Sequence, residues 1–195
     1  MTPVTLVTGF LGTGKTTAIR SLLATAARGE RWAVLVNEIG EVGIDAATLD
    51  TDGLVVREVA GGCICCSVAV PFRVAVTQVL REVKPDRLII EPSGLADPTS
   101  LIDTLRGPHL GASVELTATI GLVHPHRMHD PRIAEHPVHR AQLAVADVLV
   151  ATFAEVASAE DLQRFHEVAV EYPLRPAAIR NAQDAGASKV RLSLL

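Results

Sequence analysis

The stretch PVTLVTGFLGTGKTT, residues 3–17, decides the fold of this 195-residue chain. Its first half is rich in β-branched residues and stops at Gly9, a pattern typical of a buried strand. Its second half, from Gly9 to Thr16, matches the pattern G-x-x-x-x-G-K-[ST] in full. From Lys15 to Ala27 the apolar residues then recur with helical spacing. A strand, this loop and a helix in that order predict a P-loop and a nucleoside triphosphate site.

The residue types in this loop suit phosphate. Gly12 and Gly14 let the backbone curl around Thr13, so that successive N–H groups point inward and the helix N-terminus adds its positive dipole. Lys15 is expected to reach the β- and γ-phosphates and the Thr16 hydroxyl to bind Mg²⁺. The next residue, Thr17, is expected at the α-phosphate.

Apolar segments recur along the rest of the chain and alternate with helical patterns. Further strands are predicted at 32–36, 54–59, 87–90, 114–123 and 147–150, and further helices at 68–83 and 157–170. The strand at 54–59 carries polar residues and is predicted at or near a sheet edge. Because most strands are apolar throughout, we expect a three-layer α/β/α sandwich of the P-loop NTPase class with a mostly parallel sheet.

Composition limits the class of protein. The chain has a mass of 20.7 kDa, 48% hydrophobic and 21% charged residues, a net charge of −4 and a pI near 6.0. These values argue against disorder and against a basic nucleic-acid binder, and no apolar run is long enough to cross a bilayer. We expect one domain over residues 1–195 and a cytoplasmic location, with no nucleic-acid or membrane partner.

A P-loop protein needs a second strand that ends in a carboxylate to hold Mg²⁺ directly or through water. The strand at 87–90 is followed by Glu91, which supplies that carboxylate. The spacing from Glu91 to Gly94 resembles the D-x-x-G element of GTPases, in which the glycine amide senses the γ-phosphate. Between the P-loop and the strand that ends at Glu91, a glycine-containing loop carries Glu38, Glu41 and Asp45. They could position the attacking water, bind a metal, or form only a solvated turn.

All three cysteines of the chain lie within four residues, at Cys63, Cys65 and Cys66. Such spacing cannot make a disulfide framework, which staples distant segments. Soft thiolates favour Zn²⁺, Co²⁺ or Cu(I), and three of them leave a fourth position for Glu38, water or a partner's ligand. The alternative is that these cysteines bind nothing and are only small hydrophobic side chains buried in the core. We interpret the cluster as a binding site for a transition metal.

Together these pieces resemble the CobW-type GTPases, metal-handling relatives of the GTPases that insert nickel into urease and hydrogenase. The matching segments are 9–17, 37–45, 61–66, 91–98, 142–147 and, more weakly, 174–179. The resemblance implies a P-loop GTPase fold and GTP-dependent delivery of a transition metal, with the three cysteines as ligands. Family members often carry a C-terminal domain, and the resemblance is to a nucleotide-binding domain without it.

The sequence departs from the GTPase pattern at the base site. Guanine specificity normally comes from N-K-x-D after a later strand, and the corresponding residues here are Thr152, Phe153, Ala154 and Glu155. Glu155 could still accept hydrogen bonds from the base, and Phe153 could stack on it in place of the lysine stem. Thr152 is a poor substitute for the amide. We therefore expect a weakened preference for GTP, with ATP tolerated, or low turnover.

A stretch from His124 to His139 holds five histidines and three prolines. Histidine-rich tracts can bind metal, but the prolines argue against a regular scaffold, and we expect a polar surface loop with solvated imidazoles.

The sequence thus predicts a nucleotide-binding, GTP-hydrolysing metallochaperone-like protein. Its expected ligands are GTP with Mg²⁺ and a Zn²⁺ or Co²⁺ ion. Its expected partners are a client metalloprotein or cofactor-synthesis enzyme and a second copy in a nucleotide-dependent homodimer. The main alternative is a degenerate, non-hydrolysing or ATP-tolerant regulatory module. A P-loop ATPase or kinase outside this family is a third reading, although no acceptor pocket is evident.

Overall fold

The computed structural model describes residues 1–24, 26, 29–36, 54–58, 69–172 and 179–181. Its strands are β1 (Thr2–Gly9), β2 (Trp32–Val36), β3 (Leu54–Glu58), β4 (Arg87–Glu91), β5 (Val114–Val123), β6 (Val148–Ala151) and β7 (Ile179–Asn181). Its helices are α1 (Lys15–Leu23), α2 (Ala69–Glu82), α3 (Pro98–Arg106), α4 (Pro131–Ala134), α5 (Pro137–Ala144) and α6 (Ala159–Ala169), with a 3₁₀ helix η1 (Pro125–His129).

The strands form one sheet in the order β3-β2-β4-β1-β5-β6-β7, and every pairing among the described residues is parallel. The predicted parallel sheet is confirmed, and β3 lies at an edge as its polar residues indicated. The chain moves from β1 to β2 and β3 on one side and later to β5, β6 and β7 on the other. In sheets of this kind, ligands bind outside the carboxyl ends of the strands where the direction reverses, which here is around β1 and β4.

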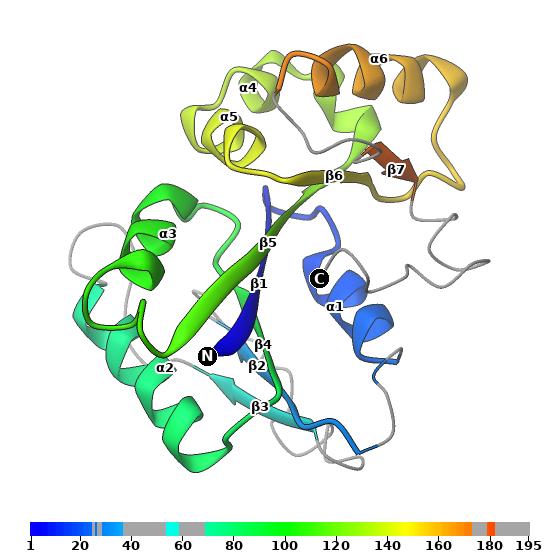
Figure 1. Ribbon diagram of the computed structural model, residues 1–195. Coiled ribbons are helices and arrows are strands. Elements are labelled where there is room, and N and C mark those ends of the chain that lie inside the picture. The colour runs from blue at the N-terminus through cyan, green and yellow to red at the C-terminus, as the bar shows by residue number, and fades with distance from the viewer. Residues whose placement is uncertain (25, 27–28, 37–53, 59–68, 173–178, 182–195) are drawn as a thin grey trace.

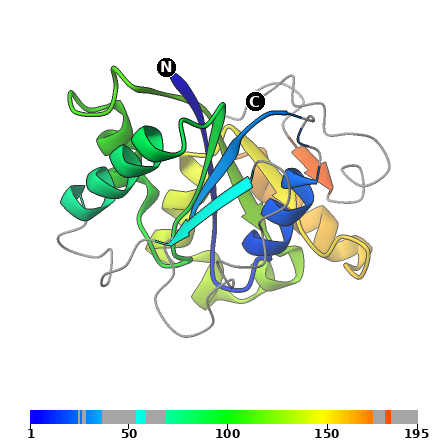
Figure 2. The same cartoon turned by 90° about the horizontal axis from the view of Figure 1, so that it is seen from below.

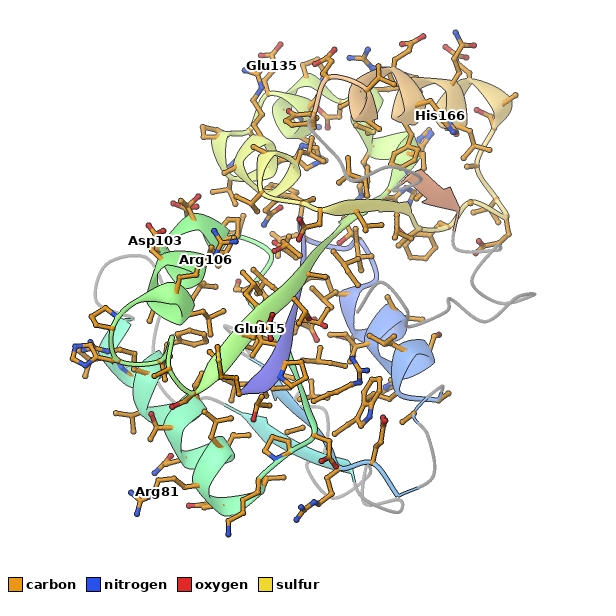
Figure 3. All side chains as sticks on the ribbon, in the orientation of Figure 1. Arg81, Asp103, Arg106, Glu115, Glu135 and His166 are labelled. Atoms are coloured by element: carbon orange, nitrogen blue, oxygen red, sulfur yellow. The ribbon has the colours of Figure 1, made fainter. Side chains whose placement is uncertain are left out.

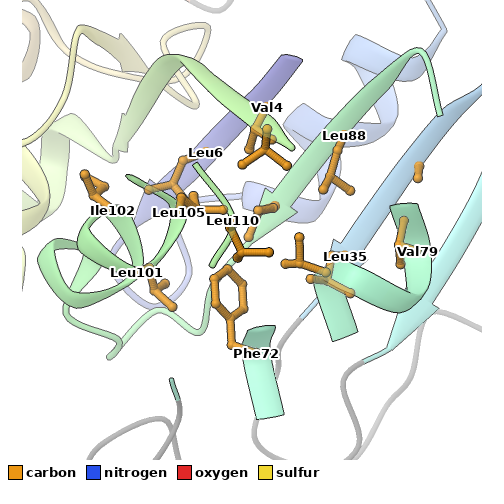
Figure 4. Packing of buried hydrophobic residues seen from close by; sticks show 14 residues of the cluster. Val4, Leu6, Leu35, Phe72, Val79, Leu88, Leu101, Ile102, Leu105 and Leu110 are labelled. Atoms are coloured by element: carbon orange, nitrogen blue, oxygen red, sulfur yellow. The ribbon is translucent and has the colours of Figure 1, made fainter. Parts of the chain in front are cut away.

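Helices cover both faces of the sheet. Successive strand residues point to opposite faces, so strands that are apolar throughout need a helix layer on each face. On one face, Leu6 and Leu35 pack with Phe72 of α2 and Leu105 of α3 (Figure 4). On the other, the sheet packs against α1, with Ile19 at the centre. Figures 1 and 2 show α2 and α3 on one side of β1 and α1 on the other. This is the predicted three-layer α/β/α arrangement.

Outside the segment from His124 to Ala144, three elements differ from the sequence prediction in their length or existence. Helix α1 ends at Leu23 rather than Ala27, since the N–H of Ala26 bonds to the carbonyl of Leu23 in a tight turn. Helix α3 was not predicted, although Asp97 caps it by accepting from the Thr99 N–H, and Pro98 is its first residue. Strand β7 was not predicted either, because three residues give too short a pattern.

The expectation of a loop from His124 to His139 was wrong. Each of its three prolines opens a helix instead: Pro125 begins η1, Pro131 begins α4 and Pro137 begins α5. Proline suits a first helical position because its missing N–H has no intrahelical partner there anyway. His139 is 3% exposed, whereas His126 and His129 are exposed as expected. No helix within the described ranges is both long and apolar enough to span a membrane.

Candidate functional site

The loop between β1 and α1 has the conformation of a phosphate cradle. Gly12 and Gly14 have φ angles of 71° and 77°, the left-handed region that glycine adopts without strain. Gly14 is the N-cap of α1 and provides no side chain to bind the first helical N–H groups. A Ser, Thr or Asp at that position would occupy one of them. These N–H groups are thus left to meet an anion, whose charge the helix dipole favours.

Lys15 folds back over this loop. Its Nζ donates to the carbonyl oxygens of Gly9 at 3.1 Å and Phe10 at 3.4 Å. The ammonium thus lies inside the curve of the loop, where a β- or γ-phosphate oxygen would replace neutral carbonyl partners with charged ones. The role of Lys15 at the phosphates stays a prediction.

Thr16 and Glu91 come together from elements 75 residues apart. The Thr16 Oγ1 donates to Glu91 Oε1 at 3.1 Å, and Glu91, at the end of β4, is 4% exposed. Strands β1 and β4 are neighbours, with Leu6 opposite Ile90, so the carboxyl end of β4, which carries Glu91, lies beside the first turn of α1, which carries Thr16. A hydroxyl and a carboxylate are the hard oxygen ligands that Mg²⁺ prefers. The two side chains expected from sequence to bind Mg²⁺ therefore lie within hydrogen-bond distance of each other, and their role as its ligands stays a prediction.

Gly94 lies against the P-loop. A Cβ built on it would be 2.8 Å from the backbone nitrogen of Leu11 and 3.0 Å from the Leu11 Cα, so only glycine fits there without displacement. Gln142 of α5, which is 2% exposed, donates from Nε2 to the Gly94 carbonyl at 3.1 Å. The segment after Glu91 is thus tied to α5 on one side and touches the P-loop on the other. The role of Gln142 could not be read from sequence, because its partner is a backbone carbonyl 48 residues away.

The side of the P-loop where the sequence predicts the base is lined by aromatic rings. Phe153 follows β6 with a φ of 55°, is 38% exposed and stacks on His124 with ring centroids 4.7 Å apart. A Cβ on Gly14 would be 3.5 Å from the Phe153 ring, so the ring flanks the P-loop. The Thr152 hydroxyl donates to the Val123 carbonyl at 3.0 Å and is committed to the sheet, while Glu155 is exposed.

Burial lowers the pKa of His124, with a further contribution from the positive charge of Arg127. Beneath the loop, His136 and His139 pack against Phe10, with ring centroids 4.9 and 5.9 Å from it. Burial lowers the pKa of His139 to about 4. His139 is therefore a neutral packing group beside Phe10 at pH 7.

The expected transition-metal ligands Cys63, Cys65, Cys66 and Glu38 lie outside the described residues, as does Glu41. Within the part of the chain that the structure describes, no three His, Cys, Asp or Glu side chains are grouped to hold a metal ion. One further residue beside the P-loop escaped the sequence reasoning: Arg127 of η1 donates to the Leu11 carbonyl. Its position depends on how η1 folds back from β5.

Comparison with protein families and curated proteins gives consistent matches. A model described as the CobW/HypB/UreG nucleotide-binding domain matches residues 3–177. The zinc chaperone YeiR of Escherichia coli is 45% identical over 163 residues, covering 84% of this chain and 50% of its own length. The zinc chaperone CobW of Pseudomonas aeruginosa is 37% identical over 204 residues, covering 88% and 54%. The chain thus spans about half the length of these curated relatives.

Solved structures match as well. The Zn(II)-bound YjiA GTPase from Escherichia coli superimposes with a TM-score of 0.63 at 29% identity, covering 89% of this chain and 57% of that one. The hydrogenase maturation factor HypB from Archaeoglobus fulgidus gives a TM-score of 0.64 at 18% identity, covering 93% and 82%. The second match supports the fold alone.

Proposed function

The chain belongs to the CobW/HypB/UreG family of nucleotide-binding domains, and we propose that it hydrolyses GTP and uses the cycle to handle a transition metal. The proposal of GTP hydrolysis rests on one observation: the Thr16 hydroxyl is hydrogen-bonded to Glu91 beside Lys15, whose side chain folds back over the P-loop. Relatives named as zinc chaperones, and one named as a GTPase with Zn(II) bound, support the metal half.

The described side chains fit a Mg²⁺–nucleotide complex. Thr16 and Glu91 would hold Mg²⁺, which neutralises charge on the β- and γ-phosphate oxygens. Lys15 exchanges the Gly9 and Phe10 carbonyls for phosphate oxygens, while the N–H groups of the P-loop, from Gly12 to Thr17, bind the remaining ones. The Gly94 amide senses the γ-phosphate, and Glu41 orients the attacking water.

The metal half rests on Cys63, Cys65 and Cys66, with Glu38 as a fourth ligand, holding Zn²⁺ or Co²⁺. Three thiolates with an exchangeable fourth position suit a metal that must be handed on. The cysteines lie in sequence between two segments expected to sense the γ-phosphate, the loop from Asn37 to Asp45 and the segment from Glu91 to Gly94. Contacts with the γ-phosphate would order the first of these segments, and hydrolysis would release it. Nucleotide state then alters the affinity for the metal.

The base site favours a second candidate, an ATP-tolerant or non-hydrolysing regulatory module. Phe153 offers a stacking face that accepts any purine, and Thr152 has its hydroxyl committed to Val123. Among residues 152–155, Glu155 carries the carboxylate that can accept hydrogen bonds from the guanine N–H groups. We propose GTP as the substrate with ATP as a poorer one.

We further propose a single nucleotide-binding domain over the matched residues 3–177 and a cytoplasmic location. The partners would be a client metalloprotein or cofactor-synthesis enzyme, with a homodimer forming in the nucleotide-bound state. A thiolate site that must release its metal needs such an acceptor.

Phosphate release tests the proposal directly. It is measured with GTP and with ATP, each with and without Zn²⁺ or Co²⁺, for the wild type, Lys15→Ala and Glu91→Gln. Matched controls are Lys84→Ala, between α2 and β4, and Glu115→Gln, an exposed carboxylate on β5 toward the opposite end of the sheet (Figure 3). We expect release by the wild type and both controls and loss in both site variants. Nucleotide binding without phosphate release under any condition would favour the regulatory module.

A further inference from the structure

Arg127 places a second cation on the P-loop. Its Nη1 donates to the Leu11 carbonyl oxygen at 2.5 Å. A Cβ built on Gly12 would be 2.9 Å from that Nη1 and 3.2 Å from Cζ, so the guanidinium lies directly over the Leu11–Gly12 backbone. Within the described ranges, Arg127 forms no ion pair with an Asp or Glu. Within those ranges, the group that accepts a hydrogen bond from its side chain is a neutral carbonyl.

The contact lies at the γ-phosphate end of the loop. Lys15, which reaches β- and γ-phosphates in P-loops, is held on the carbonyls of Gly9 and Phe10, the two residues before Leu11. The Leu11 backbone is also the part of the loop that Gly94 touches. Two cations therefore rest on three successive carbonyls beside the glycine that the proposed function assigns to γ-phosphate sensing.

The fold fixes η1 from both sides of Arg127. Leu122 of β5 is paired with Gly9, so the chain that leaves β5 must pass the P-loop. His126 and His129 both contact Asp161 Oδ1, at 3.3 and 3.0 Å. Asp161 is itself held by the capping box with Ser158 at the start of α6. These contacts hold η1 in place and so position the Arg127 guanidinium at the P-loop.

We propose that Arg127 binds the γ-phosphate of the bound triphosphate and stabilises the charge that spreads over its oxygens during transfer. This role rests on the proposed nucleotide function and adds a ligand to it. A guanidinium binds phosphate through two charge-assisted hydrogen bonds, which are stronger than one bond to a neutral carbonyl. An arginine supplied from the same chain is one of the ways in which phosphoryl-transfer sites are completed.

The test compares Arg127→Ala and Arg127→Lys with Arg132→Ala, which removes an exposed arginine of α4 paired with Asp130. Each protein is checked by thermal unfolding. The affinities for GDP and for a non-hydrolysable GTP analogue are then measured with Mg²⁺, together with the single-turnover rate of GTP hydrolysis. For Arg127→Ala we expect GDP affinity within about twofold, analogue affinity lower by about tenfold, and hydrolysis lower by about 10³-fold. Arg127→Lys recovers analogue affinity more than hydrolysis, because lysine cannot bind bidentately.

Equal losses for GDP and the analogue would overturn the role, since they would show that Arg127 only braces the loop. Unchanged affinities for both GDP and the analogue would also overturn the proposed role. If the wild type binds no triphosphate, the proposed nucleotide function fails and this role fails with it. If the wild type binds but does not hydrolyse, the ratio of the two affinities still decides the role of Arg127. Arg132→Ala should match the wild type throughout.

Discussion

Replacing Gly94 with alanine should damage nucleotide binding through the P-loop backbone. The added Cβ would lie 2.8 Å from the Leu11 nitrogen, and ordinary contact begins near 3.4 Å, so the Leu11 backbone must withdraw by about 0.6 Å. Overpacking of this kind costs about 1–3 kcal/mol of folding free energy. Sites of this kind tolerate about 0.5 Å of displacement, so we expect nucleotide affinity to fall by about 10- to 100-fold.

Gly111→Ala is the matched control. Its Cβ would lie 2.8 Å from the Arg106 carbonyl oxygen, an equally tight backbone contact, but in the turn before β5 begins. Thermal unfolding and calorimetric titration with GDP and a GTP analogue are measured on both variants. We expect similar losses of stability and a loss of affinity only in Gly94→Ala. Wild-type affinity in Gly94→Ala, or equal loss of affinity in both variants, would refute the reasoning.

Two further predictions concern the aromatic and histidine groups around the loop. Phe153→Ala should weaken GTP and ATP binding by the same factor, about 5- to 150-fold, because base stacking contributes about 1–3 kcal/mol regardless of the base. Calorimetry with both nucleotides checks this, and a loss confined to GTP would contradict it. In the folded protein the pKa of His139 is about 4, against 6.5 for an exposed histidine, so folding favours its neutral form. The free energy of unfolding is therefore unaffected by this group above pH 6.5 and decreases as the pH falls from 6.5 toward 4, by about 3 kcal/mol in total. Urea unfolding from pH 7.5 to 4.5 should show a steeper decline for the wild type than for His139→Leu, and equal slopes would be the contrary result.

The conformation of the P-loop segment and its meeting with Glu91 could be predicted from sequence, whereas their role in binding phosphate and Mg²⁺ stays a prediction. The spacing from Gly9 to Thr16 dictates a loop and a helix start, and an apolar strand ending in Glu91 can meet that loop only at the carboxyl edge of a parallel sheet. The edge position of β3 followed from its polar residues in the same way.

What was missed depends on tertiary folding. Arg127 and Gln142 act on backbone carbonyls of distant segments, and no residue pattern signals such a partner. Pro125, Pro131 and Pro137 were interpreted as breaking regular structure, whereas each begins a helix. That preference was available from sequence, since each proline directly follows a His or Asp able to precede a helix.

The affinity for Zn²⁺ in three nucleotide states tests the central claim most directly. It is measured by competition with a chromogenic chelator for the protein alone, with GDP, and with a non-hydrolysable GTP analogue, and a variant with Cys63, Cys65 and Cys66 changed to serine gives the baseline. We expect the GDP and analogue states to differ by at least about tenfold, with zinc changing nucleotide affinity by the same factor, because coupling between two sites is reciprocal. Equal zinc affinity in all three states would contradict the account.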